Sequence, residues 1–501
     1  MSYSKTLAKG MIIVMISLVL TKVLGYGYKI IISRWLGAND FGLFALALAI
    51  ISLIASIMIS GIQLALSRYI AYHREKKDPE KIKRIIGATL QTILITNIIA
   101  GIGFWIFATE IAVFFHHPEI ASLLKIFAFL LPFYSTLLTL QKIFEGFQRI
   151  ELSTAADIVL NGLRILLVGA LVLTGMTIEG VSTTYLIATI CTTVVFWIIC
   201  EKVLTAFTRN IFTNNVKEMQ NIVSFSWPLM ISIIVHIIMT WSDTLLLGFY
   251  RTASEVGIYN IATPTANLLT VPAVALTTVF MPLMSNLFAK KETEQMMKLY
   301  STVTKWTFLI ALPVILAIIL FPQRIINSTA GMGYVEGASV LLLLGIGVFI
   351  NAIAAPANMI LLAMDKTKFM MKNSIIACII SLGLNFYLIP KFGVLGAGIA
   401  FLASSLIIAL LRMIEIKTLL QIIPLDKKIG KLMIMSIVTA IVAIGVDMWL
   451  GTWIMMDIWR LGANILSIGS VYVGLLYFTK CFDEEDKEII NAIKAKMSKK
   501  I

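Results

Sequence analysis

Apolar residues run along this chain in long stretches, and short groups of charged residues separate one stretch from the next. Most stretches approach or exceed the ~20 apolar residues with which a helix crosses the hydrocarbon core of a bilayer. One helix for each stretch predicts an all-α protein of about fourteen membrane spans. The predicted spans are 9–33, 41–67, 85–108, 120–142, 152–174, 180–201, 221–249, 256–284, 302–322, 337–363, 373–390, 393–416, 431–450 and 458–479.

Composition indicates a membrane environment rather than water. Of the 501 residues, 59% are hydrophobic and only 14% are charged, whereas soluble domains carry roughly a quarter charged residues. The first apolar run follows Lys5 and Lys9 and continues to Ser33 without the small-residue cleavage site of a signal peptide, so we expect a retained first helix. No connection is long enough to fold alone, and function is therefore expected among the helices.

Lysine and arginine residues sort to one side of the predicted spans. The connection from Arg68 to Arg84 and the tail after Lys480 are both basic, whereas the opposite side holds Arg34, Arg251, Arg324, Lys391 and Arg460. By the positive-inside rule, both termini are expected in the cytoplasm. Topology and attraction to anionic lipid headgroups then account for the net charge of +14, and no nucleic-acid partner is needed.

An internal repeat relates the two halves of the chain. Asp40–Phe44 and Glu255–Tyr259, 215 residues later, share the pattern acid, apolar, Gly, apolar, aromatic, and Gly180 matches Gly396 at nearly the same offset. We therefore predict two parallel six-helix lobes with a cavity between them, as in transporters built from repeats. The predicted divisions are 1–215 for the first lobe, 216–425 for the second, and 426–501 for two appended helices and an amphipathic tail on the inner leaflet.

Two motifs carry a resemblance to a known family. Arg34–Phe44, with the sequence RWLGANDFGLF, resembles the "R-x-LG-x-x-(D/E)-aromatic-G-L-F" start of polysaccharide transporters, the O-antigen-type flippases. Asn385–Gly398, NFYLIPKFGVLGAG, resembles their "LN-x-x-LIP-x-aromatic-G-x-x-GA" segment. These flippases belong to the multidrug/oligosaccharidyl-lipid/polysaccharide (MOP) exporter superfamily, and the resemblance covers essentially the whole chain. The stage V sporulation protein B and lipid II flippase branches remain open.

The resemblance implies a function as well as a MATE-like fold. It implies a flippase in the plasma membrane of a prokaryote, which carries a polyprenyl- or dolichyl-linked oligosaccharide from the cytoplasmic to the outer leaflet by alternating access. The implied partners are this substrate, membrane lipids and polysaccharide-assembly proteins. No nucleotide-binding loop or metal site is apparent in the sequence, so no cofactor is expected, and coupling to protons or Na⁺ is left open.

Charged residues near the middle of a span are costly, so they are candidates for function. Lys22 and Lys29 lie seven residues apart on one face of the first helix, and Arg164 lies near the centre of the fifth. We interpret them as the site for a phosphate or diphosphate head, which Arg binds bidentately and Lys as a point charge. Arg68 is a candidate for first contact at the cytoplasmic end. The structural alternatives are that Lys29 snorkels to headgroups, that Arg68 serves topology, and that Arg164 pairs with Asp157.

Acidic residues and prolines give the remaining candidates. Asp157 and Asp243 are candidates for ion coupling, although Asp243 would serve equally well to pair a cation. The predicted helix over 256–284 contains three prolines, each of which removes a backbone hydrogen bond and favours a kink, so they are gate candidates or merely curve the helix: Pro264, Pro272 and Pro282.

Two other functions are compatible with a chain of this kind. A multidrug or cation exporter of the same superfamily would have an acid-dominated cavity, which Lys22 and Arg164 argue against. A membrane enzyme that uses the same lipid-linked sugar, such as a ligase or polymerase, would need a sizeable outer loop with catalytic groups, and the sequence predicts none.

Overall fold

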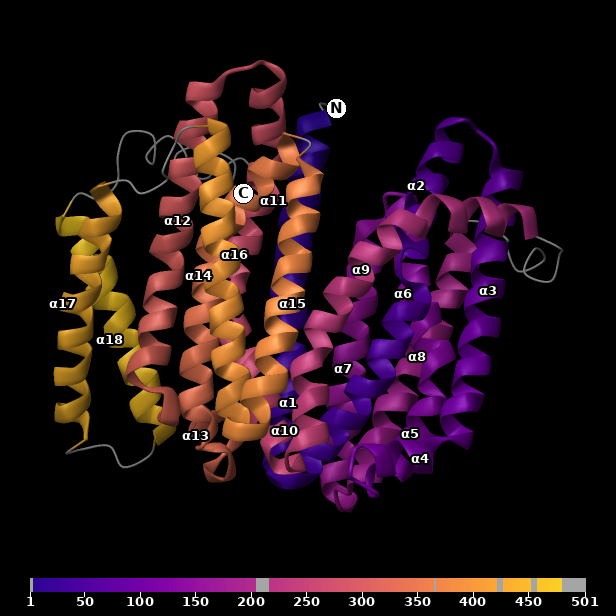
Figure 1. The fold of residues 1–501 in the computed structure, drawn as a ribbon, viewed down its shortest axis with the longest axis horizontal. Coiled ribbons are helices and arrows are strands. Elements are labelled where there is room, and N and C mark those ends of the chain that lie inside the picture. Colours follow the sequence, from indigo (N-terminus) through magenta and orange to yellow (C-terminus); the bar gives the residue numbers. More distant parts are fainter. Residues whose placement is uncertain (1–2, 204–215, 365, 421–426, 452–456, 480–501) are drawn as a thin grey trace. The chain divides into compact units, whose positions relative to one another are not determined.

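The computed structural model describes residues 3–203, 216–364, 366–420, 427–451 and 457–479. All regular structure in these ranges is helical, as predicted (Figure 1). The helices are α1 (Tyr3–Ile59), α2 (Ile62–Glu75), α3 (Pro79–Ile106), α4 (Ala108–Phe114), α5 (Ile120–Ala128), α6 (Leu130–Gly146), α7 (Ile150–Thr174), α8 (Ile178–Val203), α9 (Val216–Tyr250), α10 (Ala253–Asn267), α11 (Thr270–Ala289), α12 (Thr293–Leu320), α13 (Pro322–Ala330), a 3₁₀ turn (Met332–Tyr334), α14 (Gly337–Ala363), α15 (Thr367–Phe392), α16 (Val394–Leu420), α17 (Lys427–Leu450) and α18 (Asp457–Phe478).

Eleven of the described helices are long and apolar enough to cross a membrane, and the bent pair α5 and α6 makes a twelfth. The difference from about fourteen predicted spans has a local cause. The segment Val19–Ile59 of α1 counts once, although it contains most of the first two predicted spans. The predicted span over 256–284 is divided between α10 and α11. The chain is thus a multi-pass membrane protein, and its span count depends on how broken helices are treated.

Glycines mark the breaks in the N-terminal helices. Gly37 has a φ of 75° and a ψ of 174° inside α1, so it separates the first two predicted spans without a loop. Gly61, also with a φ of 75°, separates α1 from α2. Residues with a Cβ rarely adopt this left-handed region, and glycine does so at little cost. The predicted span over 41–67 therefore ends at Ile59, and α2 continues past it to Glu75.

Residue contacts divide the chain into two compact units, which we describe separately. Unit 1 comprises residues 1–264 and 374–400, and unit 2 comprises residues 265–373 and 401–501. The predicted lobe boundaries fall on residues 204–215 and 421–426, which lie outside the described residues, and the lobe division stays a prediction. The amphipathic tail after Asp483 also lies outside them.

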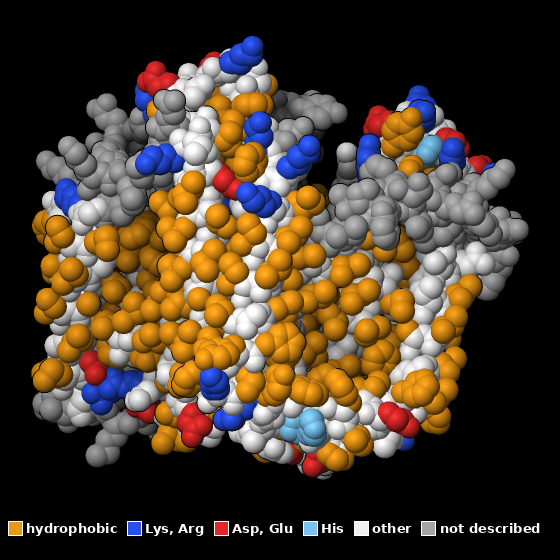
Figure 2. Space-filling model, in the orientation of Figure 1, with side chains coloured by type: hydrophobic (Ala, Val, Ile, Leu, Met, Phe, Trp, Pro, Cys, Tyr) orange, Lys and Arg blue, Asp and Glu red, His pale blue; other side chains and the backbone are white. Residues whose placement is uncertain are grey.

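Each unit has its own apolar core. In unit 1, Ile86, Leu90 and Phe144 are fully buried within one hydrophobic cluster. In unit 2, Phe280 and Tyr300 belong to a second cluster. On each unit, Figure 2 shows a band of hydrophobic side chains between zones where charged side chains gather. The exposed apolar band matches a bilayer as solvent, since lipid makes no demand for a polar surface.

In unit 2, ionic contacts attach α17 and α18, the two appended helices, to α13. The Asp447 carboxylate on α17 accepts hydrogen bonds from the Arg324 guanidinium and from Arg460 Nε, the latter at 3.0 Å. Asn464 Nδ2 donates to the same carboxylate at 2.7 Å. Asn327 of α13 donates to Asp457 at the start of α18. Three helix-borne groups thus converge on the Asp447 carboxylate, which makes it the central group of this attachment.

Candidate functional site

The predicted cations of the first helix lie beside α7 in unit 1. At Gly25, between the two lysines, an added Cβ would lie 3.6 Å from Asn161 Oδ1, so the side chain of Asn161 on α7 packs against α1 there. Lys22 is exposed and Lys29 is partly buried. Within the described ranges, neither ammonium group forms a hydrogen bond or an ion pair. No acidic side chain in the described part of the chain therefore forms an ion pair with either lysine.

Arg164 projects from α7 into a group of aromatic rings. Its Cζ lies 3.7 Å from the ring centroid of Tyr185 on α8, in a cation–π contact. The rings of Tyr28, Phe44 and Phe127 lie around Tyr185 at centroid distances of 6.1, 6.0 and 6.0 Å. Arg164 is only 8% exposed. The tyrosine face thus supports the flat guanidinium, as aromatic rings do for buried arginines.

One edge of this guanidinium has no partner among the described residues. Arg164 Nε and Nη2 are buried without a hydrogen-bond partner, and so is the hydroxyl of Tyr28. Nε and Nη2 form the edge with which arginine binds a carboxylate or phosphate through two parallel hydrogen bonds. Buried donors are nearly always paired, so this edge is an exception that needs an explanation.

The alternative pairing of Arg164 with Asp157 is not formed. Asp157 Oδ1 instead accepts a hydrogen bond of 2.7 Å from Gln141 Nε2 on α6. Gln141 was not predicted as part of the site, and nothing in the local pattern of α6 distinguishes it. Arg164 is therefore a buried cation that is supported by an aromatic ring and forms no direct ion pair with Asp157.

Asp243 on α9 is the centre of a second polar cluster in unit 1. It is 8% exposed, and its carboxylate accepts hydrogen bonds from Tyr259 Oη at 2.5 Å and from Asn385 Nδ2 at 2.6 Å. Asn385 Oδ1 is buried without a partner among the described residues. His236, the other polar residue predicted on this helix, is exposed. Neutral donors, rather than a cation, thus surround Asp243.

The partners of Asp243 lie within the two motifs on which the sequence resemblance rests. Tyr259 is the aromatic residue of the repeated acid–Gly–aromatic pattern, and Asn385 opens the NFYLIP segment. Both residues belong to the sequence motifs, and neither motif indicates that the two residues meet. Their spacing contained no signal for the contact, because Asn385 and Asp243 are 142 residues apart.

Gly42 and Gly257, the glycines of the repeated motif, each pack against the backbone of the other copy. A Cβ on Gly42 of α1 would lie 1.7 Å from the carbonyl oxygen of Ala253 at the start of α10. A Cβ on Gly257 of α10 would lie 2.2 Å from the carbonyl oxygen of Ala38. The two contacts are equivalent, because Gly42 and Ala38 in the first copy correspond to Gly257 and Ala253 in the second. Only glycine permits this approach.

Glu255, the acidic residue in the second copy of the repeated motif, also has a structural role. Glu255 Oε2 accepts a hydrogen bond of 3.1 Å from Val394 N, the first residue of α16, and Arg251 Nε donates to Glu255 Oε1 at 2.9 Å. Gly393, with a φ of 55°, leaves no room for a Cβ beside this carboxylate. The NFYLIPKFG segment is thus held against the repeated motif by a carboxylate at a helix N-terminus.

The remaining candidates lie at other places in the chain. Arg68 is exposed on α2, and it has interactions of its own. Further along α2, the Lys76 ammonium lies 4.4 Å from the ring centroid of Tyr72, and a hydrogen bond with Lys76 lowers the pKa of the Tyr72 phenol.

The prolines bracket a real break in the predicted span over 256–284. Pro264 lies inside α10, which ends at Asn267, and α11 begins at Thr270. Pro272 falls in the first turn of α11, where its missing N–H is not needed. The side chains of Pro272 and Pro282 lie outside the described residues. The break confirms an interrupted helix, and its action as a gate stays a prediction.

Comparison with known proteins agrees with these features. Residues 7–288 match the family described as "Polysaccharide biosynthesis protein", and residues 228–387 match the family described as "MatE". The uncharacterized membrane protein MJ1068 of Methanocaldococcus jannaschii is 25% identical over 454 residues, which cover 85% of this chain and 87% of that protein. "Probable low-salt glycan biosynthesis flippase Agl15" of Haloferax volcanii is 23% identical over 184 residues, 37% of this chain and 39% of that protein.

Solved structures share the fold. "Lipid II flippase MurJ, inward closed conformation" has a TM-score of 0.76 at 17% identity and covers 93% of this chain and 98% of its own. An inward-facing multidrug resistance MATE family transporter of the MOP superfamily has a TM-score of 0.66 at 16% identity, covering 80% and 94%. The chain thus shares the fold of these two transporters, and it belongs to the family described as "Polysaccharide biosynthesis protein".

Proposed function

We propose that this transporter flips a lipid-linked oligosaccharide, carried on a polyprenyl or dolichyl phosphate or diphosphate, from the cytoplasmic to the outer leaflet. The observation that carries the proposal is that the described residues offer no hydrogen-bond partner to the Nε–Nη2 edge of Arg164 or to the Tyr28 hydroxyl. A buried cation without a counter-charge costs several kcal/mol. A phosphate oxygen pair would satisfy both donors of that edge at once.

The two lysines of α1 suit the same ligand. Lys22 and Lys29 precede and follow the α1–α7 contact at Gly25, and neither is compensated by an acid among the described side chains. An anionic head that approaches along α1 would therefore meet positive charge at successive depths. The names of relatives such as Agl15 and of the MurJ fold neighbour describe flippases, which supports a lipid-linked cargo.

Asp243 is the candidate for coupling this movement to an ion. Its carboxylate and the unpartnered Asn385 Oδ1 are oxygen atoms in one buried cluster. Such a cluster suits a proton or a hard cation such as Na⁺. Asp157, held by Gln141, is the second candidate. We expect Asp243→Asn to abolish the stimulation of transport by an ion gradient while substrate still binds.

The mechanism we propose is alternating access in the plasma membrane of a prokaryote, with both termini in the cytoplasm. The break between α10 and α11, with Pro264 and Pro272 on either side of it, is the proposed gate. Arg68 makes the first contact with the head at the cytoplasmic end. The partners are the lipid-linked glycan, membrane lipids and the polysaccharide-assembly proteins that act before and after transfer.

The test is transfer of a labelled dolichyl- or undecaprenyl-diphosphate glycan in proteoliposomes. Arg164→Ala should weaken head binding about 10- to 100-fold, because hydrogen bonds to charged groups contribute about 1.5–3 kcal/mol each. Arg164→Lys should restore only part of it, since Lys lacks the bidentate edge. Lys125→Ala, which removes a cation that lies over Trp105, is the control and should leave transfer unchanged. Unchanged transfer in both Lys22→Ala and Arg164→Ala would refute the cationic site.

A multidrug exporter remains the second candidate because residues 228–387 match the MatE family. A drug exporter would bind organic cations at an available carboxylate. Here the Asp243 carboxylate is already occupied by Tyr259 and Asn385. Resistance to cationic dyes that depends on Asp243, in cells that show no defect in glycan transfer, would favour this candidate over the flippase.

A further inference from the structure

Phe44 of α1 belongs both to the repeated motif and to the aromatic group around Arg164. It is the residue that ends the first copy of the motif, Asp40–Phe44, and it is 3% exposed. Its ring meets that of Phe127 on α5 at a centroid distance of 5.7 Å and that of Tyr185 on α8 at 6.0 Å, both edge-to-face. Phe44 therefore packs directly against the ring that supports the Arg164 guanidinium.

The ring of Tyr185 is held on several sides. Phe44 and Phe127 both meet it edge-to-face, and the ring of Tyr28 is tilted against it. The ring quadrupoles favour such edge-to-face pairs. Because Arg164 Nε and Nη2 have no hydrogen-bond partner among the described residues, the orientation of the guanidinium depends on the Tyr185 ring. A displacement of Phe44 would therefore loosen Tyr185 and change the direction of the free arginine edge.

The same helix segment carries the glycine contact between the two copies of the motif. Gly42 lies two residues before Phe44, in the part of α1 that follows the break at Gly37. Two positions along a helix are about 200° of rotation, so Gly42 faces the backbone of Ala253 at the start of α10 while Phe44 faces α5 and α8. No loop separates the two residues. A displacement of Gly42 from α10 therefore also displaces Phe44.

The second copy of the motif has the same arrangement at its own polar cluster. Tyr259 is the residue equivalent to Phe44, and it lies two residues after Gly257. Its hydroxyl donates a hydrogen bond of 2.5 Å to the Asp243 carboxylate, while Gly257 packs against the backbone of Ala38. In both copies, the glycine thus meets the other copy and the aromatic residue reaches a buried functional candidate or its support.

We propose that Phe44 is a positioning residue for the anion site, which holds Tyr185 against Arg164 while Gly42 lies against α10. The proposal rests on the proposed function for the identity of the ligand, but it concerns the orientation of Arg164 and not the cargo. When the glycine contact opens, Phe44 moves with its helix, Tyr185 loses an edge contact and the guanidinium loses its orientation. The affinity for a phosphate head then falls, so opening of the contact promotes release of the head.

The orientation of Arg164 can be measured without a ligand. In full-length protein with ¹⁵N-labelled arginine in detergent micelles, the ring current of Tyr185 should shift the Arg164 Nε–H proton upfield, because Cζ lies 3.7 Å from the ring centroid. The signal is assigned by its absence in Arg164→Lys. We expect Phe44→Leu to remove most of the upfield shift. The matched control is Phe144→Leu, which removes a fully buried ring that meets Phe196 edge-to-face at 6.1 Å, and it should leave the shift unchanged.

Glycine variants test the connection to the contact between the two copies. Gly42→Ala should remove the shift as Phe44→Leu does, because the new Cβ separates α1 from α10. Gly257→Ala opens the same contact from the other copy, so it serves as the second variant if Gly42→Ala does not fold. Gly27→Ala, whose Cβ meets no atom within 4 Å, should leave the shift unchanged. An unchanged shift in Phe44→Leu, or in a folded variant of Gly42 or Gly257, would overturn the proposal.

Binding of inorganic pyrophosphate to the purified protein separates this proposal from the proposed function. Phe44→Leu should weaken binding about 3- to 10-fold, the effect expected when an aromatic pair is lost. In Arg164→Ala, the added Phe44→Leu substitution should have no further effect, because both residues act on one site. An equally large effect without Arg164 would overturn the positioning role. A parent protein that binds no pyrophosphate, but loses the upfield shift in Phe44→Leu, would refute the phosphate site and leave the positioning of Arg164 standing.

Discussion

The reciprocal glycine contact between α1 and α10 gives the most direct structural prediction. In Gly42→Ala, the new Cβ would lie 1.7 Å from the carbonyl oxygen of Ala253, although ordinary contact begins at 3.4 Å. The obstacle is backbone and cannot rotate away, so the helices must separate by about 1.7 Å. Overpacking of this kind costs about 1–3 kcal/mol, and more where the backbone moves.

The expected losses of stability for related substitutions follow from the contact distances in the same way. Gly257→Ala places its Cβ 2.2 Å from the carbonyl oxygen of Ala38, so its cost should be somewhat smaller. The double variant should cost less than the two single costs combined, because each substitution opens the same contact. Gly27→Ala is the control in the same helix: no atom lies within 4 Å of its Cβ, and alanine favours a helix by up to about 1 kcal/mol.

The assay is thermal stability in detergent, measured as the temperature at which half of the monodisperse protein is lost. We expect the midpoints to fall in the order Gly27→Ala, Gly257→Ala and Gly42→Ala, from highest to lowest. A Gly42→Ala midpoint equal to that of Gly27→Ala would refute the reasoning. It would mean that α1 and α10 do not meet at these glycines in the folded protein.

Two further substitutions test the polar clusters of the two units by the same thermal assay. Asp447→Ala should lower stability by about 1–3 kcal/mol, which is less than the ~3–5 kcal/mol lost when a fully buried ion pair is broken. The smaller cost is expected because the side chains of Arg324 and Arg460 are 22% and 20% exposed. A midpoint equal to that of the parent would show that the attachment of α17 and α18 does not depend on this carboxylate. Asp243→Ala should lower stability by about 1–3 kcal/mol, because it leaves the donors of Tyr259 and Asn385 unpaired. Asp243→Asn should lower stability less. Equal midpoints for the two variants would contradict the hydrogen-bonded geometry.

The candidate site could be predicted only in part. Arg164 was identified because a charge in the middle of an apolar run is costly wherever the helix packs. Its support by Tyr185 was not predictable, because that contact depends on how α7 and α8 face each other. The same limit explains Asp157, whose partner Gln141 lies on another helix rather than at the expected spacing along its own.

The sequence by itself determined the solvent, the helical class and the repeat of this protein. Hydropathy is a sum over neighbouring residues, so it can be calculated from the sequence. Because lipid offers no hydrogen bonds, a long apolar segment in a bilayer pairs its own backbone N–H and C=O groups by forming a helix. The matched motifs at Gly42 and Gly257 likewise required only comparison along the chain.

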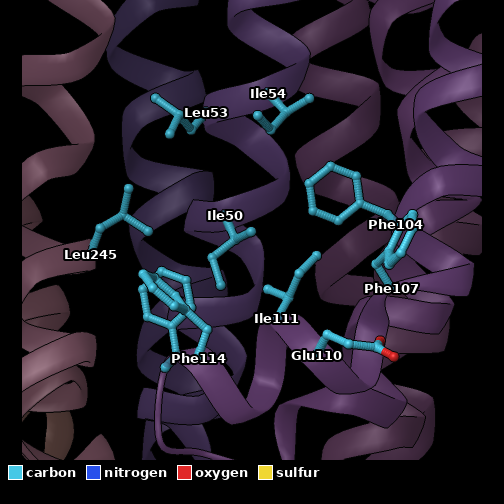
Figure 3. Close-up of a pocket in the computed structure, with 10 residues that line it drawn as sticks. Ile50, Leu53, Ile54, Phe104, Phe107, Glu110, Ile111, Phe114 and Leu245 are labelled. Carbon is cyan, nitrogen blue, oxygen red and sulfur yellow. The ribbon is translucent and has the colours of Figure 1, made fainter.

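The tertiary structure alone decided which of those residues meet. It placed Asn385 on Asp243, left one edge of Arg164 without a partner among the described residues, and formed an open apolar hollow lined by α1, α4 and α9 (Figure 3). Each feature joins segments that are distant in the sequence. Hydrogen bonds and cavities depend on distances of a few ångströms between such segments, and helix packing sets these distances.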